Sequence, residues 1–221
     1  MRNGFMKLVS DVSVAREAWN ELPLKFVLFM VVGVVVSEAF AGSLLAGGTL
    51  QTQLLLLRLV ELSVVVLLIF RFNLAGDLGL HRLDINGLRV LALLTGFSLV
   101  CFMALLLVST LFDYPLLSFL AAPAWVSGFA GVFLMVLLAP VVEELLFRGL
   151  IYRLIRQTFG VFISVVLSAG CFALMHGQPE FPQLFGGVVF ALAYEWSRNL
   201  WVAIGLHAAG NAAVLILALL N

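Results

Sequence analysis

Long, uninterrupted runs of apolar residues dominate the chain. They lack the alternation of apolar and polar positions that a membrane-spanning strand needs, so each run predicts a helix. A helix needs about 20 mostly apolar residues to cross a bilayer. The candidate spans are Phe26–Leu45, Leu54–Phe70, Val90–Phe112, Val126–Phe147, Val161–Met175, Leu184–Trp196 and Leu200–Leu220, of which the fifth and sixth are short. We predict an all-α, polytopic membrane helix bundle of about seven transmembrane helices, within a range of six to eight.

Composition supports the membrane assignment. Of the 221 residues, 63% are hydrophobic and only 11% are charged. This excludes a disordered chain, a disulfide scaffold and an ordinary soluble domain, because so few charges could not cover a soluble core of this size. The net charge is zero, which gives no reason to expect a nucleic-acid partner. No repeat or long linker divides the chain, so residues 1–221 are predicted to form a single integral membrane domain, and nothing in them indicates an oligomeric state.

The basic residues predict an orientation. Eleven of the twelve lie on alternate connections between the spans, and Arg58, inside the second span, is the exception. The positive-inside rule then places the N-terminus in the cytoplasm. The short loops favour a bacterial cytoplasmic (inner) membrane. The first 23 residues could form an interfacial helix; a signal-peptidase site at Ala39-Phe40-Ala41 is the weaker alternative.

Two charged pairs lie in or beside apolar runs. Arg58 and Glu61 are three residues apart on one predicted helix, so we expect them to neutralise each other inside the bundle. Glu195 and Arg198 have the same spacing at the end of the sixth span. We interpret that second pair as solvated at the membrane surface.

The segment Pro140–Gly149 carries the strongest candidate chemistry. Glu144 and Arg148 are four residues apart, so they share a helix face and predict an ion pair. Glu143 points about 100° away and is left without that partner. A buried carboxylate in this position is a candidate general base. Pro140 is expected to bend the helix just before the two acids, and a purely structural polar cluster is the alternative.

Two later spans carry histidines. His176 ends the fifth span, and His207 lies inside the seventh with Asn211 one turn further on the same face. Taken singly, such residues often only join neighbouring helices by hydrogen bonds. Together with Glu143 they supply the groups needed to activate water and to stabilise an oxyanion.

This ordered set resembles the three motifs of the CAAX prenyl protease and bacteriocin-processing family of intramembrane endopeptidases. The matching residues, on successive apolar segments, are Glu143-Glu144-x-x-x-Arg148, Phe172-x-x-x-His176 and His207-x-x-x-Asn211. The resemblance covers about residues 125–215, a predicted catalytic core. The first half of the chain rests on hydropathy alone, and eukaryotic members of the family have eight helices.

The resemblance implies an all-α bundle with a cavity, and hydrolysis of a peptide bond of a membrane-associated protein or peptide. By this resemblance, Glu143 and His176 would activate the attacking water. His207 and Asn211 would stabilise the oxyanion. Supporting roles fall to Glu144, Arg148 and Phe172. Non-catalytic alternatives with the same fold are a membrane scaffold and a bacteriocin self-immunity protein.

The sequence leaves the role of a metal open. We expect no cofactor, although Glu143, His176 and His207 could hold a divalent metal such as zinc in the two-His-one-Glu manner. The His-Glu-x-x-His helix of zinc membrane proteases is absent from the chain.

One geometric condition follows from the predicted topology. His176 is predicted near the outer end of its span, whereas Glu143 lies inward of mid-depth. The two must come within reach of one water to cooperate. Because the fifth and sixth spans are short, we expect the loop 177–182 to lie below the outer surface and His176 to lie within the membrane thickness.

Overall fold

The computed structural model describes residues 20–44, 48–112, 123–176 and 181–220, and for residues 40–44 and 220 it describes the backbone alone. Most of the predicted interfacial helix and of the loop 177–182 lie outside these ranges. The helices in chain order are α2 Leu24–Leu44, α3 Leu50–Phe72, α4 Ile85–Leu111, α5 Gly128–Phe133, η2 Leu134–Leu138, α6 Ala139–Leu146, η3 Phe147–Tyr152, α7 Arg153–Leu174, α8 Phe181–Ser197 and α9 Leu200–Leu220. The described part of the chain contains no strand, which confirms the all-α prediction.

The number of spans is not confirmed. Within the described residues, four helical stretches are long and apolar enough to cross a membrane: Leu50–Phe72, Ile85–Leu111, Gly128–Leu174 and Leu200–Leu219. The third is 47 residues long, and two of the predicted spans fall largely within it. Helix α8 has 17 residues, fewer than the about 20 that a straight crossing needs.

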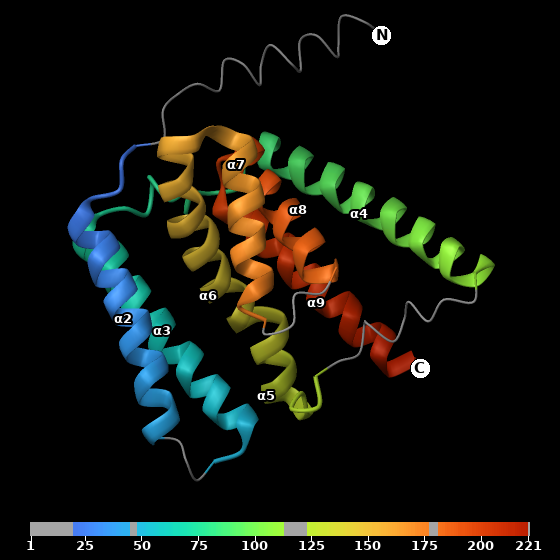
Figure 1. Ribbon diagram of the computed structural model, residues 1–221, viewed down its shortest axis with the longest axis horizontal. Helices are drawn as coiled ribbons and strands as arrows, with labels where there is room; N and C mark the ends of the chain where they lie inside the picture. The colour runs from blue at the N-terminus through green and yellow to red at the C-terminus, as the bar shows by residue number, and fades with distance from the viewer. Residues whose placement is uncertain (1–19, 45–47, 113–122, 177–180, 221) are drawn as a thin grey trace, which may run out of the picture.

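A glycine separates those two predicted spans. Gly160 has φ 77° and ψ 178°, a backbone conformation that residues other than glycine rarely adopt. The chain turns here at one end of the bundle (Figure 1). The predicted span Val161–Met175 therefore corresponds to the arm of α7 after this turn.

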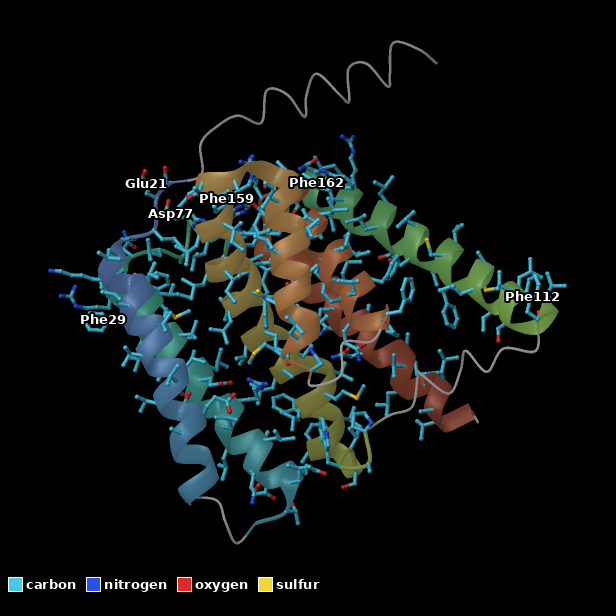
Figure 2. All side chains as sticks on the ribbon, viewed as in Figure 1. Glu21, Phe29, Asp77, Phe112, Phe159 and Phe162 are labelled. Carbon is cyan, nitrogen blue, oxygen red and sulfur yellow. The ribbon has the colours of Figure 1, made fainter. Side chains whose placement is uncertain are left out.

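The helices pack so that the first half of the chain flanks the second. Helix α2 packs on α3 at one side of the bundle, and α4 packs on α8 and α9 at the other (Figure 1). Helix α6 contacts both α3 and α9. Large apolar side chains such as Phe29, Phe112 and Phe162 lie at the periphery (Figure 2), with Phe162 79% exposed. Glu144 and Arg148, by contrast, are completely buried. Apolar side chains on the outside and charged side chains on the inside are the distribution expected of a bundle surrounded by lipid.

Helix α6 lies between two π-helical segments. Segment η2 precedes it and η3 follows it, and Pro140 stands in its first turn. Proline lacks an N–H, so the regular ladder cannot continue through it. The sequence predicts a bend at this point, and the structure has the π-helical segment η2 directly before α6, a feature often found at functional sites.

The contact between α7 and α8 depends on a small residue. A Cβ built on Gly187 would lie 3.0 Å from Ala169 Cα and 3.1 Å from Ala169 Cβ. We predict that Gly187→Ala lowers the free energy of unfolding by about 1–3 kcal/mol through overpacking. Denaturation in detergent, followed by circular dichroism, measures the change. Gly170→Ala is the matched control, because a Cβ there meets nothing within 4 Å; equal stability of the two variants would contradict the prediction.

Candidate active site

Two adjacent acids on α6 face different surroundings, as their spacing predicts. Glu144 Oε1 lies 2.9 Å from Arg148 Nη1, and both side chains have no exposed surface. The Glu143 side chain is 12% exposed and lies beside the histidines. The predicted ion pair is confirmed, and Glu143 is the acid that it leaves aside.

Glu144 also orients a histidine. The same Oε1 atom accepts a hydrogen bond from His207 Nδ1, at 2.9 Å. A carboxylate oxygen that accepts from Nδ1 places the proton on that nitrogen and turns Nε2 away. The imidazole of His207 is 3% exposed and stacks on Phe190, with centroids 4.6 Å apart and an interplanar angle of 16°. His207 therefore has one defined orientation, with Nε2 directed at the site.

Arg148 ties this part of the site to α8. Its Nη2 donates to the carbonyl of Gly187 at 2.8 Å. The guanidinium lies over the rings of Phe172 and Phe190, 4.9 Å and 5.4 Å from their centroids. Such faces attract a cation, so Arg148 is held by an ion pair, a carbonyl and two aromatic rings.

Phe172 positions the second histidine. His176 lies just beyond the end of α7, and its Nδ1 donates to the Phe172 carbonyl at 2.9 Å. A carbonyl oxygen can only accept, so Nδ1 carries the proton and the neutral ring presents a lone pair at Nε2. The Phe172 ring contacts the rings of His176 and His207, with centroids 4.6 Å and 5.4 Å away.

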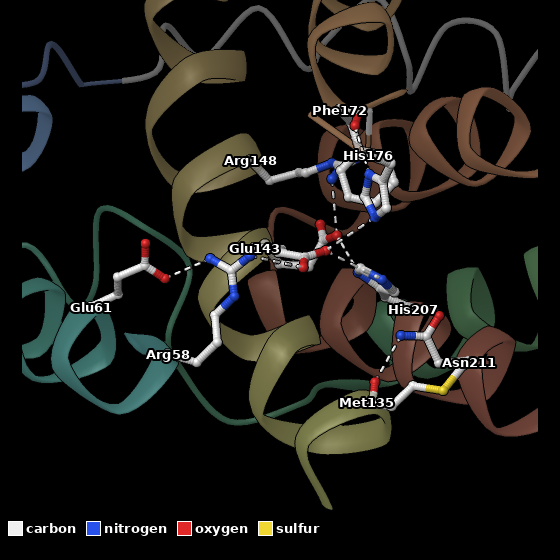
Figure 3. A network of polar contacts seen from close by, with 10 residues as sticks. Arg58, Glu61, Met135, Glu143, Arg148, Phe172, His176, His207 and Asn211 are labelled. Carbon is white, nitrogen blue, oxygen red and sulfur yellow. Dashed lines mark hydrogen bonds and ion pairs between the residues drawn. The ribbon is translucent and has the colours of Figure 1, made fainter. Parts of the chain in front are cut away.

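The two histidines converge on one carboxylate oxygen. Glu143 Oε2 lies 4.0 Å from His176 Nε2 and 3.7 Å from His207 Nε2 (Figure 3). Hydrogen bonds to water are about 2.8 Å long, so a single water can contact both Glu143 and His176. The predicted topology required that one water be able to contact both Glu143 and His176, and the 4.0 Å distance confirms this.

Asn211 lies one turn after His207 on α9 and forms a hydrogen bond with the neighbouring segment η2. Its Nδ2 donates to the carbonyl of Met135 at 2.8 Å (Figure 3). Met135 belongs to η2, whose π-helical turn alters the regular pairing of carbonyls. An amide nitrogen has two hydrogens, so one of them remains for a further acceptor. No pattern in the sequence indicates the contact with Met135.

Sequence reasoning missed Arg58. This arginine donates to Glu61 at 2.5 Å, which confirms the predicted pair. Its Nη2 also lies 3.8 Å from Glu143 Oε1. Glu143, which the helix spacing leaves without Arg148, thus has a basic neighbour from another helix, because α3 packs on α6. The one sequence feature that sets Arg58 apart is its position inside an apolar span, whereas the other basic residues lie on alternate connections between spans.

The residues proposed for a metal do not form a metal site in this arrangement. Within the described ranges, no three His, Cys, Asp or Glu side chains are placed to hold a metal ion. The Arg58 guanidinium faces the same carboxylate, and a cation there disfavours a second positive charge.

A second polar cluster lies around Glu195. This acid is 7% exposed, so the expectation of a solvated pair is wrong, although Arg198 does lie 3.5 Å from it. Arg156 lies at 3.1 Å, and the hydroxyl of Tyr152 donates to Glu195 at 2.8 Å. The packing of α8 against η3 buries the acid, which the local spacing could not reveal.

Comparison with known proteins confirms the resemblance over the second half of the chain. Residues 123–213 match the family described as type II CAAX prenyl endopeptidase Rce1-like. The membrane-embedded CAAX protease MroQ of Staphylococcus aureus (strain USA300) is 35% identical over 98 residues, which are 41% of this chain and 40% of MroQ.

A second relative comes from Bacillus subtilis (strain 168) and bears the name "Putative membrane peptidase YdiL". It is 27% identical over 85 residues, 38% of this chain and 35% of YdiL. The match thus spans less than half of either relative. No solved structure is significantly similar to the chain. The matched segment runs from before α5 into α9 and includes Asn211, whereas Arg58 lies outside it.

Proposed function

We propose that this chain, which carries an Rce1-like CAAX protease domain over residues 123–213, is an intramembrane endopeptidase. The observation that carries the proposal is the convergence of His176 Nε2 and His207 Nε2 on Glu143 Oε2. Buried acid–base groups in a membrane bundle are costly and are typically kept for function.

Glu143 and His176 are proposed to activate the attacking water. The water lies between Glu143 Oε2 and the Nε2 lone pair of His176, and its oxygen attacks the carbonyl carbon of the scissile peptide bond. Glu143 takes one proton as the new C–O bond forms. Glu143 then returns this proton to the amide nitrogen and the C–N bond breaks. The products are a new amine and a new carboxyl group, which keeps the second proton of the water until it ionises.

His207 and Asn211 are proposed to stabilise the oxyanion. Because Nδ1 of His207 is the donor to Glu144, its Nε2 can donate to an oxyanion only in the doubly protonated ring. Glu143 and Glu144 flank that ring, Glu143 near Nε2 and Glu144 near Nδ1. The second amide hydrogen of Asn211 supplies another donor. Glu144, Arg148 and Phe172 then act as positioning residues.

The substrate is proposed to be a peptide or membrane protein delivered from the bilayer. The bacterial relatives and the distribution of basic residues support a bacterial cytoplasmic membrane, with the N-terminus in the cytoplasm. The catalytic chemistry is proposed to be free of metal. Zinc bound by Glu143, His176 and His207 is the alternative that elemental analysis of the purified protein tests.

The test of function is cleavage by the purified chain in liposomes. A library of membrane-delivered peptides, with and without a lipidated C-terminus, is incubated with the protein, and products are identified by mass spectrometry. We expect cleavage at a defined set of bonds. Absence of cleavage across the library would contradict the proposal and favour a non-catalytic scaffold or immunity protein.

Removal of the proposed oxyanion donor is expected to affect turnover. Asn211→Leu should lower kcat by about 100-fold, with a small change in KM, because the donor acts mainly in the transition state. Steady-state kinetics on a cleaved peptide measures both constants. The matched control is Asn86→Leu, since the Asn86 amide likewise donates to a backbone carbonyl, that of Trp196 at 3.2 Å. Equal kinetics for the two variants would contradict the assigned role.

A further inference from the structure

We propose that Arg58 is a positioning residue that sets the orientation of the Glu143 carboxylate, an inference that rests on the proposed function. Arg58 belongs to α3, in the half of the chain that the matched domain does not include. It would make the first half of the chain part of the catalytic machinery rather than a membrane anchor for it.

The two oxygens of Glu143 have separate neighbours. Oε1 lies 3.8 Å from Arg58 Nη2, whereas Oε2 faces the two histidines at 3.7 Å and 4.0 Å (Figure 3). Attraction of Oε1 towards Arg58 turns Oε2 to the opposite side. Oε2 is the oxygen that must take the proton of the water, so Arg58 controls which oxygen is presented to it.

Glu61 holds Arg58 in this place. Its side chain has no exposed surface and lies 2.5 Å from Arg58 Nη1, while Nη2 is the nitrogen that faces Glu143. The planar guanidinium thus spans two acids with two different nitrogens, a geometry to which arginine is suited. Because α3 packs on α6, the orientation of Glu143 is fixed across a helix interface.

The charges of the cluster support the same role. Three carboxylates, of Glu61, Glu143 and Glu144, lie with two guanidiniums, of Arg58 and Arg148. Arg148 is committed to Glu144, Gly187 and its aromatic neighbours. Loss of Arg58 therefore removes the cation that faces Glu143 Oε1.

The test must separate positioning of Glu143 from simple neutralisation of Glu61. Arg58→Gln alone leaves the buried Glu61 without its ion-pair partner and is expected to destabilise the fold. The double variant Arg58→Gln/Glu61→Gln removes both charges and avoids this cost. If Arg58 positions Glu143, the double variant folds as wild type does but has a kcat about 100-fold lower, as a misplaced catalytic group gives, with little change in KM.

Three companion variants complete the test. Glu61→Gln alone retains Arg58 beside Glu143 and should lose less activity than the double variant. Arg58→Lys retains the positive charge and should recover part of the lost kcat. In a Glu143→Gln background, the double variant should cause no further loss, because Arg58 acts through Glu143. Arg71→Gln, an exposed arginine of the same helix, is the control for loss of an arginine.

Wild-type kcat in the double variant would overturn the inference and leave the proposed function standing. A Glu61→Gln variant as slow as the double variant would overturn it too, because the loss would then belong to Glu61. Absence of cleavage by the wild-type chain would reject the proposed function, and this inference with it.

Discussion

Arg148→Gln is expected to lower the free energy of unfolding by about 3–5 kcal/mol, because it removes the buried cation that pairs with the Glu144 carboxylate. Glu144 and Arg148 have no exposed surface, and Arg148 also bonds to the Gly187 carbonyl of α8. The variant therefore loses the ion pair and a link between helices. Denaturation in mixed detergent micelles, followed by circular dichroism, measures the loss.

Two comparisons make this prediction specific. Arg71→Gln removes an exposed arginine and should change the free energy of unfolding by less than about 0.5 kcal/mol. The double variant Glu144→Gln/Arg148→Met removes both charges and should be more stable than Arg148→Gln. Unfolding curves that coincide for Arg148→Gln and Arg71→Gln would show that the buried pair contributes little.

Glu143→Gln is expected to reduce kcat by about 100-fold or more, the contribution typical of a positioned general base. Glutamine has nearly the same shape but cannot take the proton of the attacking water. The fold should be retained, because Glu144 and not Glu143 pairs with the buried Arg148. Kinetics on a cleaved peptide, together with denaturation of the same preparation, measures both effects.

The same substitution at an exposed acid is the control. Glu21→Gln changes a carboxylate to an amide on an exposed residue and should leave kcat and KM unchanged. A comparable loss of activity in this variant would mean that the effect at Glu143 comes from altered charge or expression and not from its position in the site.

Much of the site could be predicted because it depends on helix periodicity. The spacing of Glu144 and Arg148 was enough to pair them, as the 2.9 Å contact confirms, and it set Glu143 apart from that pair. The order of the acids and histidines along the apolar segments was enough to identify the resemblance, which residues 123–213 bear out. The roles of these residues stay predictions until variants are assayed.

The remaining features depend on which helices pack together, which local spacing does not determine. Arg58 reaches Glu143 because α3 contacts α6, and Glu195 lies where α8 packs on η3 and α7. The contact of Asn211 with Met135 similarly joins α9 to a π-helical turn. Hydropathy identified the apolar helices, but it could not fix how many of them cross the membrane.

Peptide cleavage in H₂¹⁸O, with wild type and Glu143→Gln side by side, tests the central claim most directly. For wild type, Glu143-dependent attack by water predicts one heavy oxygen in the new carboxylate of each cleaved peptide. For Glu143→Gln it predicts labelled product at a rate lower by about 100-fold or more. Equal rates in the two proteins, or no labelled product from wild type across the library, would contradict the account.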